Sequence, residues 1–321
     1  PVTVTVQRGA NMKFDVKLVR ALIEVPTAKY GMIEGTKTGY VRLIEFTPET
    51  PNRLQHALDS FEQEGFDSLI IDVRDNPGGL ITSVVNVVDK FIDEGVIVST
   101  KSRVLFENHE FLATPDKTTF TKKVPIVILI NRGSASASEI LSGALKDYHL
   151  AYLVGEKTYG KGSVQQVIPL SNTDGFKMTT ARYYTPSDVN IDKIGIPPDL
   201  EIKNFFIPKE QEDVYVKLVE SGELEKLAKE NSNMTEAEIA KAAEELAKTY
   251  PIDLRILRRL IRVQAKKAQS AALYDMDYDI QLQEALKIVQ RPDFFDLVKN
   301  TKTLKELQEE AEQKAAETQE E

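Results

Sequence analysis

The chain has 321 residues and 41% hydrophobic content, which is enough for one large domain or two ordinary ones with a core that needs no covalent staples. It contains no cysteine, which excludes disulfides, thiolate catalysis and thiolate metal sites. The formal net charge of −9 and the absence of Trp give nucleic-acid binding little support.

The chain starts inside an alternating run of β-branched residues, Val2 to Val6, which predicts a strand. It shows neither an initiator methionine nor a signal peptide, and we interpret it as a segment of a longer protein. The longest apolar run, Val124 to Ile130, has the length of a strand and not of a membrane span.

Residues up to about 205 alternate short apolar runs with stretches of helical periodicity, which is typical of an α/β domain. Strands are predicted at Val2 to Val6, Phe14 to Glu24, Tyr40 to Phe46, Ser68 to Val73, Val124 to Ile130, Ala151 to Gly155 and Phe176 to Tyr184. Helices are predicted at Thr50 to Gln63, Leu80 to Ile92 and Ser136 to Asp147.

The remainder is rich in Ala, Leu, Glu and Lys and is acidic, with 18 Lys and Arg against 25 Asp and Glu in residues 206–321. We therefore expect two parts, an α/β domain at residues 1–205 and an all-helical region at residues 206–321. A capping box of Thr235 and Glu238 predicts a helix from Glu236 to Lys248, and Pro251 begins another. The last segment, from Thr301, is expected to be a solvated helix.

A basic stripe follows the predicted helix from Asp253 to Lys267. Its residues are Arg255, Arg258, Arg259, Arg262 and Lys266. A membrane or a partner protein is one candidate for this stripe, but we favour packing against acidic neighbours, with Asp275, Asp277 and Asp279 as the candidates.

A candidate nucleophile follows the buried strand that ends at Ile130. The chain passes through a Gly-containing turn into a helix, with serines at Ser134, Ser136 and Ser138. A serine in such a turn is exposed beside unpaired amides that suit an oxyanion, although helix capping is the alternative role. Spacing alone does not choose among the three, but Ser134 is the better cap, accepting from the amide of Ala137.

None of the three histidines is an obvious general base for such a serine. His149 lies 13 residues after Ser136, about 20 Å away along a regular helix, and His56 and His109 lie in polar surroundings. A lysine can act as a base if burial removes its charge, and Lys161 is flanked by glycines that permit close approach.

The segment around Lys161 also matches a phosphate-binding loop except at its last position. Gly162 stands there in place of the Ser or Thr that would bind magnesium. The following residues, Ser163 to Pro169, predict a strand, whereas a phosphate loop opens a helix. We therefore treat the match as accidental.

Three sequence blocks in this order resemble the carboxyl-terminal processing, or tail-specific, serine proteases. They are Asp72 to Gly79, Gly133 to Glu139 and Tyr159 to Gln166, and the similarity covers about residues 1 to 205. The resemblance implies a ClpP/crotonase-like core and no metal or cofactor. It also implies roles for six residues, with Ser136 as nucleophile, Lys161 as general base, Gln165 as the residue that orients the lysine, and Gly78, Gly79 and Ala137 as the oxyanion hole.

The resemblance further implies an upstream PDZ domain in the full-length parent, which is either deleted here or naturally absent. Pro1 to Arg8 looks like the strand that follows that domain. It also implies an extracytoplasmic location, in a bacterial periplasm or cell envelope, and protein or peptide substrates with accessible C-termini. The amphipathic helices between Pro208 and Lys299 are expected to contribute to a homodimer.

Two other classes of protein share features with this sequence. Retinoid-binding modules resemble the core but lack the serine and the lysine, and crotonase-type acyl-CoA enzymes share the oxyanion-hole architecture but give no role to a Ser-Lys pair. The presence of Ser136, Lys161 and Gln165 favours the peptidase.

Overall fold

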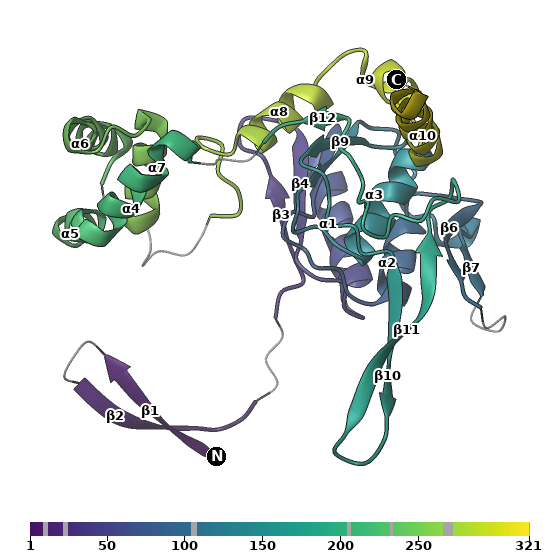
Figure 1. Ribbon diagram of the computed structural model, residues 1–321, viewed down its shortest axis with the longest axis horizontal. Helices are drawn as coiled ribbons and strands as arrows, with labels where there is room; N and C mark the ends of the chain where they lie inside the picture. Colours follow the sequence, from purple (N-terminus) through teal and green to yellow (C-terminus); the bar gives the residue numbers. More distant parts are fainter. Residues whose placement is uncertain are drawn as a thin grey trace.

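The computed structural model describes residues 1–8, 12–21, 25–103, 108–203, 207–231, 234–265 and 272–320 (Figure 1). Its strands are β1 (Val2–Arg8), β2 (Met12–Leu18), β3 (Ala28–Met32), β4 (Thr38–Leu43), β5 (Ser68–Asp72), β6 (Val96–Lys101), β7 (His109–Leu112), β8 (Ile126–Ile130), β9 (Tyr152–Gly155), β10 (Ser163–Pro169), β11 (Gly175–Tyr184) and β12 (Leu200–Glu201). Its α-helices are α1 (Thr50–Glu64), α2 (Ile81–Val88), α3 (Ala137–Asp147), α4 (Glu212–Ser221), α5 (Glu223–Glu230), α6 (Glu236–Thr249), α7 (Leu254–Ala265), α8 (Ile280–Val289), α9 (Phe294–Lys299) and α10 (Leu304–Glu320).

The core is a six-stranded sheet in the order β12-β9-β8-β5-β4-β3. All neighbours are parallel except β3 and β4, which form an antiparallel edge pair. Strands β5 and β8 lie side by side, with Leu69 opposite Ile126. Because they are parallel, the turns that follow Asp72 and Ile130 meet at the same edge of the sheet, where open α/β sheets form their sites.

Helices cover both faces of this sheet. Alternate residues of β5 face opposite sides, so Leu69 and Ile71 pack with α1, α2 and α3, while Ile70 packs with α8. On the second face, Leu282 and Ile288 of α8 meet the sheet. The fold prediction of an α/β core followed by helices is confirmed.

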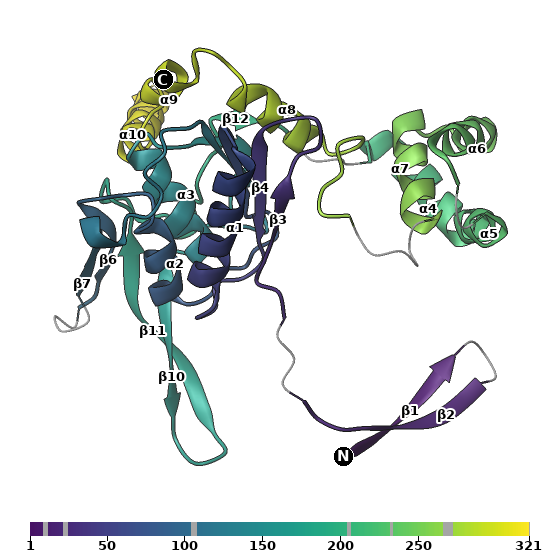
Figure 2. The ribbon, with the colours of Figure 1, turned by 180° about the vertical axis from the view of Figure 1, so that it is seen from behind.

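A second sheet extends from the core in the order β10-β11-β6-β7, with all neighbours antiparallel. Its β10–β11 hairpin projects from the body of the molecule, and β1 and β2 form a separate hairpin that also stands clear of the six-stranded sheet (Figure 2). The pairing of β10 with β11 shifts register between Val164 and Gln165.

The C-terminal helices fall into two packing groups. Helices α4 to α7 bury their own core, which includes Leu218, Ile239, Leu257 and Ile261. Helices α8 and α9 pack on the α/β core instead, and α10 contacts α3 through Leu304. Within the described ranges, no helix is long and apolar enough to cross a membrane.

Several local predictions can be compared with this fold. The capping box is confirmed, since Thr235 Oγ1 accepts from the Glu238 amide and the Glu238 carboxylate accepts from the Thr235 amide. Helix α7 begins at Leu254 and not at Pro251. Strand β2 ends at Leu18, so the predicted strand to Glu24 is too long, and its residues 22–24 lie outside the described residues.

The basic stripe meets acidic neighbours as predicted. Arg262 of α7 pairs with Asp277 at 2.7 Å and with Asp275 at 3.4 Å. The third candidate, Asp279, pairs with Arg74 of the core instead. Lys266 and Lys267 of the predicted helix lie outside the described residues.

Candidate active site

The turn between β8 and α3 holds its serine in a strained backbone conformation. Ser136 has φ +55° and ψ −113°, a region that non-glycine residues rarely adopt. Helix α3 begins at the next residue, Ala137. A strained serine at a strand-to-helix turn is the arrangement that exposes a nucleophile at the top of an α/β sheet.

The prediction that Ser134 caps helix α3 is wrong. The residue at the N-cap position is Ser136, and Ser134 is fully buried two residues earlier in the turn. Its Oγ accepts a hydrogen bond from the Asn131 amide at 3.0 Å and donates to the Val73 carbonyl at 2.7 Å. Ser134 therefore joins the turn after β8 to the turn after β5.

The turn after β5 is held against the serine turn by Asn76, which is fully buried. Its carbonyl accepts from the Ala135 amide at 3.0 Å and from Ser138 Oγ at 2.9 Å. Its side chain donates to the Leu43 carbonyl and accepts from the Gly78 amide. One residue thus links β4 and the glycine turn through its side chain and the start of α3 through its carbonyl.

The two glycines of this turn approach other residues too closely for side chains. A Cβ on Gly78 would lie 2.8 Å from Ser136 Cβ, and one on Gly79 would lie 2.2 Å from the Phe46 carbonyl oxygen. Both have positive φ, which favours glycine. In the described part of the chain, the amides of Gly79 and Ala137 have no hydrogen-bond acceptor, whereas the Gly78 amide donates to Asn76 Oδ1.

A buried carboxylate connects the serine turn to the lysine loop. Glu139 accepts hydrogen bonds from the amides of Ser136, Lys161 and Gly160, at 2.8 to 2.9 Å, and from the hydroxyl of Thr158 at 2.5 Å. Burial raises the pKa of the Glu139 carboxyl, although these hydrogen bonds favour its charged form. Glu139 therefore fixes the backbones of Ser136 and Lys161 relative to each other.

Tyr183 of β11 makes a second connection between the same two segments. Its hydroxyl donates to the Lys161 carbonyl and lies 3.3 Å from the Ser136 carbonyl. Burial raises the pKa of this phenol well above its ordinary value, so it stays protonated as a donor. Tyr183 is buried, and it also lines the cavity described next.

These segments enclose a cavity of about 290 Å³ beside the serine. Its walls are Gly79, Leu80, Ile81, Ser136, Ala137, Ile140, Lys161, Ser163, Val164, Gln165, Lys177 and Tyr183. Five of the six predicted site residues therefore line one cavity, and the sixth, Gly78, lies against Ser136. The pairing of β10 with β11 shifts register immediately before Gln165, so the strand is locally irregular at this wall of the cavity.

The three histidines do not line this cavity. His56 is exposed on α1 and His109 is exposed on β7. His149 lies at the end of α3, where its Nδ1 is 3.2 Å from Thr301 Oγ1. Residues 163–169 form strand β10 and not a helix, which excludes the phosphate-loop interpretation of Lys161. The described residues contain no group of three or more His, Asp or Glu arranged to hold a metal ion.

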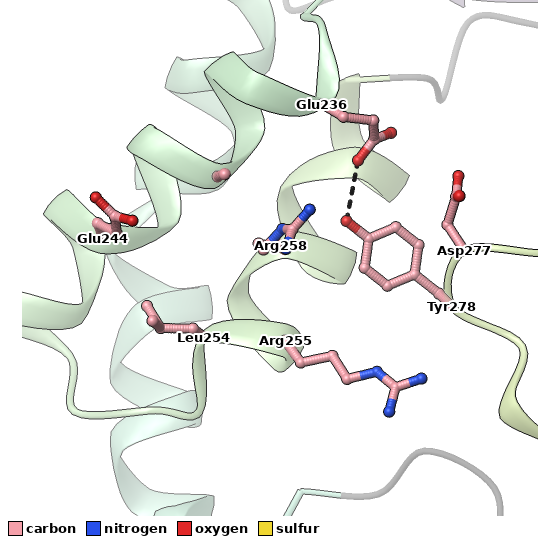
Figure 3. Close-up of a pocket in the computed structure, with 8 residues that line it drawn as sticks. Glu236, Glu244, Leu254, Arg255, Arg258, Asp277 and Tyr278 are labelled. Atoms are coloured by element: carbon pink, nitrogen blue, oxygen red, sulfur yellow. Dashed lines mark hydrogen bonds between the residues drawn. The ribbon is translucent and has the colours of Figure 1, made fainter.

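A larger cavity, of about 570 Å³, lies in the helical region between α6, α7 and the segment before α8 (Figure 3). Its charged walls include Glu236, Arg258 and Asp277, and the Tyr278 hydroxyl donates to Glu236 at 3.1 Å. Its walls, as far as the described residues form them, include no serine or lysine. It therefore offers no nucleophile with a base.

Comparison with known proteins identifies the class. Residues 37–202 match the sequence model of peptidase family S41, and the chain belongs to this family. It is 42% identical over 208 residues to a carboxy-terminal-processing protease of Bartonella bacilliformis, covering 63% of this chain and 47% of that protein. It is 42% identical over 194 residues to a carboxyl-terminal-processing protease of Synechocystis, covering 60% and 44%.

Among solved structures, the photosystem II D1 C-terminal processing protease matches with 34% identity and a TM-score of 0.49, over 60% of this chain and 52% of that one. The chain spans less than half of the length of the two curated relatives above.

Sequence reasoning missed the residues that hold the site together. Asn76 and Glu139 lie in the recognised sequence blocks and Tyr183 lies in a predicted strand, but none of the three was predicted to hold the site together. One signal was present for Glu139, because its spacing of three residues from Ser136 is that of a capping box at the start of α3.

Proposed function

We propose that this chain is the catalytic part of a serine endopeptidase that cleaves proteins near their carboxyl termini. The observation that carries the proposal is the single cavity in which Ser136, Lys161 and Gln165 lie with the amides of Gly79 and Ala137. Membership of peptidase family S41 supports the same class of reaction.

In the proposed reaction, Ser136 Oγ attacks the carbonyl carbon of the scissile bond while the neutral amine of Lys161 accepts the hydroxyl proton. The carbonyl π electrons move to oxygen and give an oxyanion. Collapse of this intermediate breaks the C–N bond, and the leaving amine takes the proton from Lys161. Water, activated by Lys161, then hydrolyses the acyl ester and restores Ser136.

The proposed oxyanion hole consists of the Gly79 and Ala137 amides. The Gly78 amide donates to the Asn76 side chain and is not available to an oxyanion. Gly78 instead contributes to the site by having no side chain, which leaves room for Ser136. Gln165 is proposed to accept a hydrogen bond from Lys161 and to aim its amine at Ser136. None of these steps requires a metal or cofactor.

The proposal also concerns the whole protein, because the chain spans less than half of the length of the two curated relatives. We propose that it acts outside the cytoplasm, in a bacterial periplasm or cell envelope, and that an upstream PDZ domain presents accessible C-termini to the cavity. The relatives' names support processing at carboxyl termini.

Substitution of the two proposed reacting residues tests this function. Ser136→Ala, Lys161→Ala and Lys161→Arg should each lower peptide cleavage at least about a thousandfold, because the pair acts as a unit and a guanidinium does not deprotonate. Circular dichroism should show an intact fold, and Lys157→Ala, an exposed lysine in the same loop, is the matched control. Substantial turnover by any of the three variants would remove the pair from the mechanism.

A further inference from the structure

The proposed cleavage cavity contains a second lysine for which the mechanism has no use. Lys177 lies on β11 and lines the cavity together with Ser136 and Lys161. As far as the described residues form its walls, no Asp or Glu lines it. Although the whole chain is acidic, with a net charge of −9, this cavity has only basic charged side chains in its walls.

Lys177 makes no ion pair or hydrogen bond through its side chain with any described residue. The lysine of the neighbouring strand β6, Lys101, is by contrast paired with Asp188. Lys161 must be neutral to act as a base in the proposed reaction, so Lys177 is the remaining source of positive charge in the cavity wall. An exposed ammonium that faces a cavity without a counterion is available to a ligand carboxylate.

The register of the hairpin fixes where Lys177 lies. Gln165 is opposite Thr179, and Val167 is opposite Lys177. Lys177 and Thr179 therefore share one face, and Lys177 is about 7 Å further along the strand than the level of Gln165. An extended peptide advances about the same distance in two residues.

We propose that Lys177 binds a carboxylate of the substrate about two to three residues from the scissile bond. The carboxylate is either the terminal one of the substrate or an acidic side chain within it. This inference rests on the proposed function, because it assigns Lys177 to the recognition of the peptide that Ser136 cleaves. It makes this lysine a specificity-determining residue of the cavity.

The test compares three otherwise identical short peptides, of which one has an amidated C-terminus and no acidic residue. The second has a free terminal carboxylate, and the third is amidated with one internal Glu, each charge lying two residues from the scissile bond. Affinity is measured by fluorescence anisotropy on the Ser136→Ala chain, where no cleavage interferes, and kcat/KM is measured on the unmodified chain.

The chain with Lys177 should prefer at least one carboxylate peptide to the neutral peptide. Lys177→Gln should reduce that preference about two- to fivefold, the range expected for an exposed ion pair, and Lys177→Glu should reduce it further. Added salt should weaken the preference only when Lys177 is present. Lys157→Gln, which removes an exposed charge outside the cavity, is the matched control.

If only the preference for the free C-terminus depends on Lys177, the terminal carboxylate is the ligand. If only the preference for the internal Glu depends on Lys177, the ligand is an acidic side chain. An equal preference in the Lys177→Gln chain and the parent, or no binding of any peptide, overturns the inference. Cleavage that survives Ser136→Ala would instead overturn the proposed function, so the two failures are distinguishable.

Discussion

At the scale of single residues, the site depends on groups that hold backbone in place. Ser136 occupies a positive-φ conformation that costs of order 1–3 kcal/mol for a non-glycine residue. The hydrogen bond from its amide to Glu139 and the contacts of Asn76 with its neighbours maintain this conformation. The carboxylate of Glu139 is thus a positioning group for both Ser136 and Lys161.

Replacing Glu139 by Gln should therefore damage the site. All four partners of the carboxylate are donors, and the new amide group is itself a donor, so at least one buried N–H or O–H loses its acceptor. We expect Glu139→Gln to lower kcat about tenfold to a hundredfold, with KM nearly unchanged. Peptidase kinetics measure the effect, with the exposed Glu94→Gln as the control. A kcat equal to that of the parent would show that Glu139 does not position the reacting residues.

The sequence predicts which residues form the site better than it predicts the local geometry of the site. The residues of the three blocks indicated Ser136 and Lys161 through resemblance, whereas spacing alone left three serines open. The wrong assignment of the helix cap to Ser134 has a physical cause. The Ser134 hydroxyl accepts from the Asn131 amide and donates to the Val73 carbonyl. The second hydrogen bond joins residues that are 61 apart in the sequence. Such contacts have no local sequence signal.

At the scale of elements, Arg74 joins helix α8 to the sheet beside the glycine turn. Its guanidinium contacts Asp72 and Asp279 and donates to Gln281 at 2.9 Å. Asp279 also caps α8 by accepting from the Leu282 amide. Burial acts to raise the pKa of the Asp72 carboxyl, but its interactions with Arg74 outweigh burial and hold that pKa below its ordinary value of 3.8.

The predicted consequence is a loss of stability that depends on pH. Arg74→Met leaves Asp72 buried without its cationic partner, with the Tyr40 hydroxyl as the remaining side-chain donor, and should lower the free energy of unfolding by about 3–5 kcal/mol at pH 7. Because the pKa of Asp72 is depressed in the folded parent, its contribution is present above pH 3.8 and is lost as the pH falls further. The difference between variant and parent should therefore shrink in acid.

Urea unfolding of both proteins over a range of pH measures this difference. Arg103→Met, at an exposed position, serves as the control. A difference that stays constant down to acid pH would contradict the assigned role of the Asp72–Arg74 pair.

Most elements with strong patterns were predicted from the sequence, and most of the missed elements have weak patterns. Strand β8 is a run of five buried apolar residues, and α1 has apolar residues at helical spacing. Strands β3, β6, β7 and β12 were missed. Strand β3 contains Gly31, β7 is short and mostly exposed, and β12 has only two residues, whereas β6 is largely buried and was missed despite its β-branched run. The helical character of α8 was predicted, but its packing on the sheet depends on distant partners such as Ile70.

At the scale of the whole molecule, the helical region supports the proposal of a homodimer in part. Leu218, Leu257 and Ile261, three of the apolar residues on these helices, are buried within the core of α4 to α7. Val216, Val219 and Leu254 of the same region remain 44 to 48% exposed. These exposed apolar side chains are the surface that a second copy would cover.

Light scattering at micromolar concentration should give the mass of a dimer for this chain. The double substitution Val216→Glu and Val219→Glu, on one side of α4, should shift it to a monomer, because buried carboxylates without partners oppose association. Glu220→Gln on the same helix is a control for charge. A monomeric mass for the unmodified chain would rule out the dimer at that concentration.

The central claim is that Ser136 is a nucleophile activated by Lys161, and covalent labelling tests it most directly. Treatment with a serine-directed fluorophosphonate, followed by peptide mass spectrometry, should place one adduct on Ser136. The adduct should be absent in Ser136→Ala and strongly reduced in Lys161→Ala and Lys161→Arg, but unchanged in Lys157→Ala. Labelling of another residue, or of Ser136 at an unchanged rate without Lys161, would contradict the claim.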